Sequence, residues 1–316
     1  MIVIVTVAQD LHALSVQEKV RARGVECHIV EADRIAQRAG LSYGVGHETL
    51  DRALTSEDQR ISISEAAVLW LRTIRSTQIL HHPIEDEHAE AIVNNDSRGA
   101  LLALLDTHFR GRWISTPQAT ARGSDKVVQL AAAAATGFRV PRTLVSQSRP
   151  DILAFHRACG GRTIVKSVVG APGPMLETKY LDVERFDAAA FEAAPAIYQE
   201  YVPGRDHLRL ACFGDRSYAA RIHTPDLDWR TNLGVSITAH AVEPQLHAQV
   251  RGVLDALGLE MGIIDLKITP EGEPVWLEVN PQGQFLFLDA FVELDLAERF
   301  AEYLVDEAAA AAKPAA

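Results

Sequence analysis

The spacing of apolar and polar positions predicts alternating strands and helices at the start of the chain. Residues 2–7 form a short β-rich run, and residues 10–24 follow with helical spacing, with Asp10 as the cap and Gly24 at the end. Residues 25–33 then have the pattern of a second buried strand. A β-α-β unit of this kind favours a parallel sheet.

The rest of the first domain follows from the same pattern. A strand is predicted over 66–73 and a helix over about 85–109, while residues 41–46 and 49–55 have the pattern of a short hairpin. The turn after the first strand, VAQD, lacks the glycines of a dinucleotide-binding loop, so that kind of site is not expected there. Pro, Gly and Ser cluster in RWISTPQATARGSD, which marks the end of this domain, and Ser124 is expected to cap the next helix.

Strands and hairpins dominate the remainder of the chain. Strands are predicted over 140–145, 163–169, 196–202, 208–222 (a hairpin), 234–242 and 262–280 (a second hairpin), and helices over about 125–137, 150–159, 244–257 and from 293 onward. The expected fold class is therefore α/β followed by α+β. We expect three domains, at 1–117, 118–198 and 199–316.

The second hairpin carries the strongest chemical signal. If its loop is Glu271-Gly272, with Gly at the position that needs a positive φ, antiparallel partners place Asp265 opposite Glu278. Asn280 shares the face of Glu278 because strand side chains repeat every two residues. Three oxygen-bearing side chains are thus expected to converge at one end of a sheet.

Two buried acids need a cation between them. Carboxylate and amide oxygens without His or Cys suit Mg²⁺ that is completed by phosphate oxygens. The alternative is a salt bridge to Lys267, which shares the face of Asp265.

Cations elsewhere in the chain favour the metal and phosphate interpretation. They lie in or beside predicted strands and helix starts: Lys126, Lys166, Arg209, Arg221 and Arg230. Taken singly, each is explained as a solvated edge residue. Taken together with Mg²⁺, they are suited to neutralise a triphosphate during phosphoryl transfer.

Bulk composition narrows the classes of partner. The net charge of -11 disfavours nucleic acid as a partner, because binding to its backbone needs basic patches. The apolar N-terminal run is too short to span a membrane and lacks a basic region before it. Three widely spaced cysteines suggest neither disulfides nor a zinc site, so a cytoplasmic protein without a membrane partner is expected.

Several segments, taken in order, resemble the ATP-grasp superfamily. They are SDKVVQLAAAAATGFRVPRTLV, TIVKSVVG, YQEYVPGRDHLRL, DWRTNLG, GIIDLKI and LEVNPQGQF, and they cover roughly residues 115–290. The segments AAVLWLRTIRST and LEVNPQGQFLFLD resemble, in particular, the microviridin-type peptide maturases, or graspetide synthetases. The resemblance implies an ATP-grasp fold behind an N-terminal parallel-sheet pre-grasp domain.

The resemblance also implies a role for each site residue. Lys126 and Lys166 would hold nucleotide phosphates, and Asp206 would reach the ribose. The adenine hinge would consist of Gln199, Glu200, Tyr201 and Val202. The γ-phosphate and the acyl phosphate would face Arg209, Arg221 and Arg230. Two Mg²⁺ ions would be held by Asp265, Glu278 and Asn280.

The implied activity is that of an ATP-dependent ligase acting through an acyl phosphate. The substrate would be a ribosomal precursor peptide with a leader, in which Asp or Glu is joined to Lys, Ser or Thr; relatives suggest a homodimer. One alternative joins an amino acid or amine to a small carboxylate substrate, and another is a nucleotide-binding regulatory module without turnover. Two departures from the family are the prolines in VVGAPGPMLETKY and the absence of an Arg-Arg-Pro run in WLRTIRS.

Overall fold

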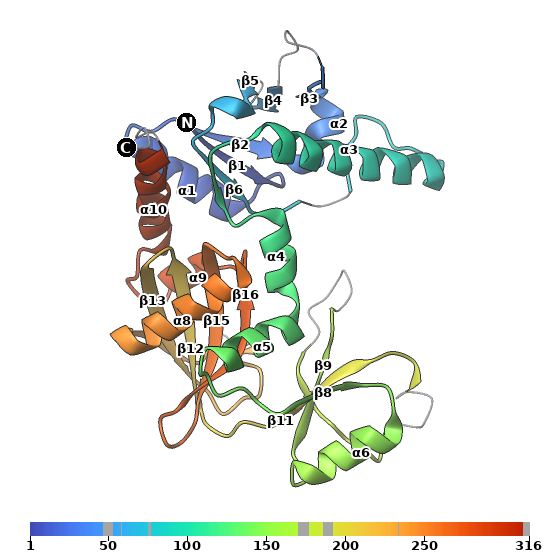
Figure 1. The fold of residues 1–316 in the computed structure, drawn as a ribbon, viewed down its shortest axis with the longest axis vertical. Helices are drawn as coiled ribbons and strands as arrows, with labels where there is room; N and C mark the ends of the chain where they lie inside the picture. Colours follow the sequence, from blue (N-terminus) through green and yellow to red (C-terminus); the bar gives the residue numbers. More distant parts are fainter. Residues whose placement is uncertain are drawn as a thin grey trace.

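A computed structural model describes residues 1–46, 53–57, 59–74, 77–169, 177–185, 192–232 and 234–311. Four sheets organise these residues, three of which carry the main body of the fold (Figure 1). The N-terminal sheet lies at one end, the long C-terminal helix runs down from it, and the other two sheets lie side by side at the opposite end.

The N-terminal sheet is parallel, as the sequence predicts. Its strands follow the order β2 (Cys27–Glu31), β1 (Ile2–Thr6), β6 (Val68–Leu71) and β7 (Arg112–Ile114). Helix α1 (Leu11–Ala22) starts where predicted, because the Asp10 carboxylate accepts a hydrogen bond from the His12 backbone N–H. The order places β1 between β2 and β6, and because these strands are parallel, the carboxyl ends of β1 and β6 lie side by side at one edge of the sheet.

Helices cover both faces of this sheet. One face packs on α3 (Glu87–His108) through Leu101, Leu104 and Leu105. The other face packs on α1 and on α10 (Leu296–Ala311), and this core continues into the C-terminal sheet. A small antiparallel sheet flanks the domain and consists of β3 (Leu41–Ser42), β4 (Ala53–Ser56) and β5 (Gln59–Ser62). The pairing of β3 with β4 confirms the predicted hairpin, part of which lies outside the described residues.

The middle sheet is antiparallel where its strands pair. The order is β10 (Lys179–Tyr180), β9 (Thr163–Ser167), β11 (Ala196–Glu200) and β8 (Thr143–Ser146). Helix α6 (Arg149–Ala158) covers it through Ile152, which packs with Tyr198. The most C-terminal residues of β11 lead directly toward the third sheet.

The C-terminal sheet is the largest. Its antiparallel order is β14 (Ser236–His240), β13 (Arg216–His223), β12 (Asp206–Phe213), β15 (Met261–Ile268) and β16 (Pro274–Asn280). One face packs on α5 (Lys126–Ala135) and α8 (Pro244–Leu257). The other face packs on α9 (Leu286–Asp289) and α10, so the last helix joins the N-terminal and C-terminal sheets into one core.

At the junction near residue 120, one helix was not predicted and one predicted helix cap is wrong. The segment rich in Pro, Gly and Ser contains a helix, α4 (Pro117–Ser124), which Thr116 caps and Pro117 begins. Pro is well tolerated at the first helical position, where its missing N–H has no partner in any case. The cap of α5 is Asp125, whose carboxylate accepts from Val127 and Val128, and not Ser124.

The hairpin β15–β16 confirms the predicted pairing of Asp265 with Glu278, although its turn differs from the predicted one. Thr269 N–H donates to the Glu273 carbonyl, so the loop is longer than the predicted Glu271-Gly272 pair and the register at its base is shifted by one. A bulge next to Asp265 shifts the register back. Asp265 therefore faces Glu278, as predicted, because the two irregularities cancel.

Candidate nucleotide and metal site

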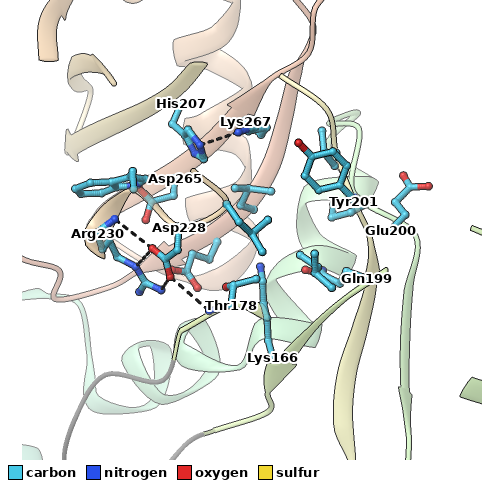
Figure 2. Close-up of a pocket in the computed structure, with 17 residues that line it drawn as sticks. Lys166, Thr178, Gln199, Glu200, Tyr201, His207, Asp228, Arg230, Asp265 and Lys267 are labelled. Atoms are coloured by element: carbon cyan, nitrogen blue, oxygen red, sulfur yellow. Dashed lines mark hydrogen bonds and ion pairs between the residues drawn. The ribbon is translucent and has the colours of Figure 1, made fainter. Parts of the chain in front are cut away.

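A cavity lies between the middle sheet and the C-terminal sheet, where the sequence predicts the nucleotide. Its lining combines cations, carboxylates and hinge residues: Pro141, Ile164, Lys166, Thr178, Gln199, Glu200, Tyr201, Val202, His207, Leu227, Asp228, Trp229, Arg230, Asp265, Lys267, Leu277 and Glu278. Figure 2 shows these side chains converging from both sheets. A cavity between two sheets, lined by apolar walls and a few convergent charges, is the usual setting of a ligand site.

Asp265 is buried and is paired with Arg209 on the neighbouring strand. Arg209 Nη1 lies 2.9 and 2.7 Å from the two oxygens of Asp265, and the two side chains are 9% and 12% exposed. Burial raises the pKa of Asp265, while the charge and hydrogen bonds of Arg209 oppose that rise. The salt bridge considered from the sequence therefore exists, but its cation is Arg209 and not Lys267.

The other two predicted metal ligands lie on the same face. Glu278 is the cross-strand partner of Asp265, and Asn280 is the partner of Ile263, two positions before Asp265. The Asn280 Oδ1 accepts from the Gln282 N–H at 3.2 Å. Within the described ranges no group of three or more His, Cys, Asp or Glu forms a metal cluster, so an ion here needs the amide or ligand oxygens as well.

This donor set suits Mg²⁺. Two carboxylates and an amide offer hard oxygens, and a triphosphate would supply the remainder of an octahedral shell. Arg209 already compensates part of the negative charge of Asp265, so the site does not depend on a resident ion to fold.

Three cations surround the carboxylates. Lys166 points into the cavity from β9 (Figure 2), and burial lowers its pKa, with Glu278 opposing and Lys126 adding to the effect. Lys126, the first residue of α5, donates to the Ser167 carbonyl at 3.2 Å. Arg230 forms a two-point ion pair with Asp228, at 2.7 and 2.6 Å. This concentration of positive charge suits phosphate oxygens.

Asp228 holds Arg230 in place. The hydrogen bond to Asp228 raises the pKa of Arg230, whose charge also faces Glu278 and Asp265. Asp228 itself has a lowered pKa, since the ion pair outweighs the opposing effect of burial. It also accepts a long hydrogen bond, 3.5 Å, from the Thr178 N–H, so it links the short 3₁₀ helix Trp229–Thr231 to the middle sheet.

The hinge residues lie along the cavity wall, with differing partners. Gln199 is 2% exposed; its Nε2 donates to Thr143 Oγ1 at 3.0 Å, and its Oε1 is buried without a partner in the described part of the chain. Glu200 instead accepts from Arg142 Nε at 2.6 Å. A buried amide oxygen without a donor is costly unless a ligand supplies one.

Tyr201 and Val202 complete the hinge. Arg162 lies over the Tyr201 ring, 4.3 Å from its centroid, and the Tyr201 N–H donates to the Arg162 carbonyl at 3.0 Å. Val202 is buried at the cavity wall. The predicted hinge is thus brought to the cavity, with Gln199 offering a free polar atom.

Lys267, considered from the sequence as a salt-bridge partner of Asp265, pairs instead with His207. Lys267 Nζ lies 2.7 Å from His207 Nε2 (Figure 2). Burial, together with the Lys267 charge, lowers the pKa of His207 to about 3, and burial lowers the pKa of Lys267 to about 8. At neutral pH, Lys267 is therefore the charged donor and His207 the neutral acceptor.

Five of the predicted residues are not in the lining of this cavity: Lys126, Asp206, Arg209, Arg221 and Asn280. Two of them, Arg221 and Asp206, lie on the face of the sheet opposite Arg209. Arg209 is the cross-strand partner of Ala220, so Arg221, the partner of Leu208, lies on the opposite face of the sheet. There, Arg221 and Asp206 form an ion pair and line a separate cavity with Tyr201 and Thr269. Successive residues of a strand point to opposite faces of the sheet. Ala220, the cross-strand partner of Arg209, therefore shares its face, and the next residue, Arg221, points to the other face.

His223 joins the same outer group. Its Nδ1 lies 2.7 Å from Asp206 Oδ1, and the hydrogen bond from Arg221, together with that of His223, lowers the pKa of Asp206 to about 2. The structure therefore gives His223 and Asp206 a common ion-pair network and places neither of them in the cavity that holds Lys166.

Sequence reasoning did not assign Asp228 to the site, and it considered Lys267 only as a salt-bridge partner of Asp265. For Lys267 the signal was available, because the register that pairs Asp265 with Glu278 also puts Lys267 on the same face. For Asp228 no such signal exists in the loop DWRTN, since its position depends on the fold around Arg230. The predicted lid, VVGAPGPMLETKY, lies largely outside the described residues.

Comparison with known proteins agrees with this geometry. Residues 1–120 match the family described as the MvdD pre-ATP grasp domain. Macrocyclase MdnC from Microcystis aeruginosa MRC, bound with precursor peptide MdnA, superposes with a TM-score of 0.84 at 20% identity, over 96% of this chain and 99% of that one. This chain has the ATP-grasp fold.

Two further solved structures are also similar to this chain. ATP-grasp ligase PsnB, complexed with a phosphomimetic variant of its minimal precursor, Mg and ADP, gives a TM-score of 0.80 at 23% identity over 97% of this chain and 98% of that one. D-cycloserine synthetase DcsG gives 0.58 at 20% identity over 97% and 99%. No curated protein matches the chain in sequence. Among the described residues, no helix is long and apolar enough to cross a membrane.

Proposed function

We propose that this chain is an ATP-dependent ligase that joins a carboxylate to an amine or hydroxyl through an acyl phosphate. The observation that carries the proposal is the cavity in which Lys166 and Arg230 face the cross-strand pair of Asp265 and Glu278. Cations beside paired carboxylates match the needs of a nucleotide triphosphate with its metal.

The nucleotide would lie along this cavity from hinge to metal site. Adenine would meet Gln199, whose Oε1 lacks a donor, while Tyr201 and Val202 form the wall. Lys126 and Lys166 would hold phosphate oxygens. Glu200, which is bound to Arg142, would contribute through its backbone.

The bound Mg²⁺, held by Asp265, Glu278 and Asn280, would supply charge neutralisation for the phosphates; we expect two ions. A carboxylate oxygen of the substrate attacks the γ-phosphorus, and ADP leaves. Arg209 and Arg230 stabilise the charge on the transferred group. An amine or hydroxyl then attacks the acyl carbon, phosphate leaves, and the nucleophile releases its proton.

We further propose that the substrate is a ribosomal precursor peptide, within which Asp or Glu is linked to Lys, Ser or Thr after a leader docks. The support is that MdnC and PsnB, which were solved with precursor peptides, fit this chain with TM-scores of 0.84 and 0.80. The alternative substrate, a small carboxylate, is supported less well by DcsG at 0.58. A cytoplasmic homodimer remains part of this proposal.

The test is mass spectrometry of a candidate precursor peptide, encoded beside the gene, after incubation with ATP and Mg²⁺. Each cross-link should remove one molecule of water from the peptide. A gain equal to an added amino acid would favour the small-molecule alternative. ATP bound without any formation of ADP or phosphate, with either class of substrate, would favour a regulatory module without turnover.

A further inference from the structure

Residues at the carboxyl end of β6 contact the segment that follows β16. Arg72 Nη1 donates to the Gln282 carbonyl at 3.1 Å, and Trp70 Nε1 donates to the Gln282 Oε1 at 2.8 Å. Arg72 is oriented by Asp10, whose Oδ2 accepts from the Arg72 Nε at 2.7 Å. Trp70 and Arg72 of the N-terminal domain thus bind Gln282, which belongs to residues 281–286, here termed the 281–286 segment.

His12 makes the second set of contacts to this segment. Its Nε2 accepts from the backbone N–H groups of Phe285, at 3.1 Å, and Leu286, at 3.3 Å. The Phe285 ring packs edge-on against the imidazole, with centroids 4.9 Å apart. Because Nε2 accepts both bonds, the ring proton lies on Nδ1, which faces Asp10 at 3.7 Å.

His12 is held neutral, as this role requires. Its side chain is 12% exposed, and burial together with the Arg72 charge lowers the pKa of His12 to about 4. An imidazolium has no acceptor nitrogen and would face the two N–H groups with donors. At neutral pH the acceptor is therefore always present.

The 281–286 segment in turn fixes the catalytic side chains of the C-terminal sheet. The Gln284 carbonyl accepts from Arg209 Nη2 at 2.9 Å, on the guanidinium that binds Asp265. The Gln282 N–H donates to Asn280 Oδ1, and the Gly283 N–H donates to the Asn280 carbonyl. A displacement of this segment would turn the Asn280 amide and shift Arg209 together.

We propose that His12 in helix α1 and Arg72, which directly follows strand β6, are positioning residues for the metal and phosphate site. They act through the 281–286 segment, which they hold in the conformation that orients Asn280 and Arg209. Neither side chain lines the nucleotide cavity. The N-terminal domain thereby contributes to ATP chemistry that takes place on other elements. This inference rests on the proposed function.

The test compares three variants of His12 and Arg72 in the full chain. His12→Leu removes the acceptor at similar volume, whereas His12→Gln keeps an oxygen that can reach the position of Nε2. Arg72→Met removes the grip on the Gln282 carbonyl. The control is His28→Leu, since His28 is buried in strand β2 of the N-terminal domain, bonds to Glu26 and makes no hydrogen bond to the segment.

The decisive readout is the Mg²⁺ dependence of ADP binding, measured by titration calorimetry, beside adenosine binding and thermal unfolding. His12→Leu and Arg72→Met should weaken ADP binding in Mg²⁺ by about ten- to a hundredfold, the usual consequence of leaving buried hydrogen-bonding groups unpaired. Adenosine binding should remain within about threefold, because the hinge is untouched. His12→Gln should restore ADP binding to within about threefold of the wild type.

The outcomes separate this inference from the proposed function. If the wild-type protein binds no ADP in Mg²⁺, the proposed function is wrong and the inference falls with it. If the wild type binds ADP and His12→Leu binds it equally well, the inference alone is overturned. The inference is also overturned if His28→Leu weakens ADP binding in Mg²⁺ as much as His12→Leu does. It is overturned as well if His12→Leu weakens adenosine binding as much as ADP binding. Either result would mean that the substitution destabilises the protein in general.

Discussion

Replacing Arg209 with methionine should leave Asp265 buried without its cation. The two side chains are 9% and 12% exposed, and Arg209 Nη1 reaches both carboxylate oxygens within 2.9 Å. Methionine fills a similar volume beside Trp229 and Phe287, whose ring centroids lie 5.5 and 5.4 Å from the guanidinium carbon of Arg209. The main loss is therefore electrostatic.

The magnitude follows from the degree of burial. Removing one partner of a buried ion pair costs about 3–5 kcal/mol, because an uncompensated charge remains. An exposed pair contributes about 0–1 kcal/mol. Arg216 and Asp306 form such a pair, with side chains 46% and 60% exposed, so Arg216→Met is the matched control.

The assay is urea unfolding at neutral pH, followed by tryptophan fluorescence, without nucleotide. Arg209→Met should lower the free energy of unfolding by about 3–5 kcal/mol, and the double variant Arg209→Met/Asp265→Asn should recover most of that loss. Mg²⁺ with ADP should raise the unfolding midpoint of Arg209→Met more than that of the wild type, since the ion would replace the lost charge.

Two results would refute this reasoning. A loss below about 1 kcal/mol for Arg209→Met would mean that Asp265 is solvated or neutral in the folded state. A double variant less stable than Arg209→Met would mean that the carboxylate does not carry the penalty. In either case the picture of a buried, charge-compensated metal ligand would have to be abandoned.

Three further predictions concern the same cavity. Glu278→Gln should lower ATP turnover by about a hundredfold or more at an unchanged melting temperature, because it removes a metal-facing charge; turnover within about threefold of the wild type would contradict this. Burial lowers the pKa of Lys267 to about 8, so its ammonium is lost as the pH rises through that value. ADP affinity should therefore fall from about pH 7 to about pH 9 in the wild type but not in Lys267→Arg, and parallel pH profiles would exclude a role for this charge. Gln199→Met should weaken ATP binding by about five- to thirtyfold, because the adenine amino group loses its acceptor, and equal weakening of GTP binding would count against that contact.

The elements that lead to the site were largely predictable. Strand β1, helix α1 with its Asp10 cap, the parallel unit with β2 and the long helix α8 all follow from periodicity and capping residues. These are local signals, and their physical cause lies within a few residues. Helix α4 was missed because its Pro, Gly and Ser residues are typical of loops, although Pro117 lies where a helix accepts it.

The site itself was predictable only in part. The pairing of Asp265 with Glu278 was predicted, but it holds because a longer turn and a bulge offset each other. The roles expected for Arg221 and Asp206 lack support, because both side chains lie on the face of the sheet opposite Arg209. The roles of the remaining predicted residues stay predictions. Most of these residues line the same cavity or share a strand face with a residue that does.

By itself, the sequence determined the order of strands and helices and the alternation that puts Asp265, Glu278 and Asn280 on one face, since these depend on backbone geometry and neighbouring residues. Only the tertiary structure decided which cation meets Asp265, which faces Arg209 and Arg221 occupy, and that His12 and Arg72 hold the segment beside Asn280. The contacts of Arg209 with Asp265, of Arg72 with Gln282 and of His12 with Phe285 join residues more than fifty positions apart. They depend on how separate sheets pack together, and no local pattern of apolar and polar residues encodes that packing.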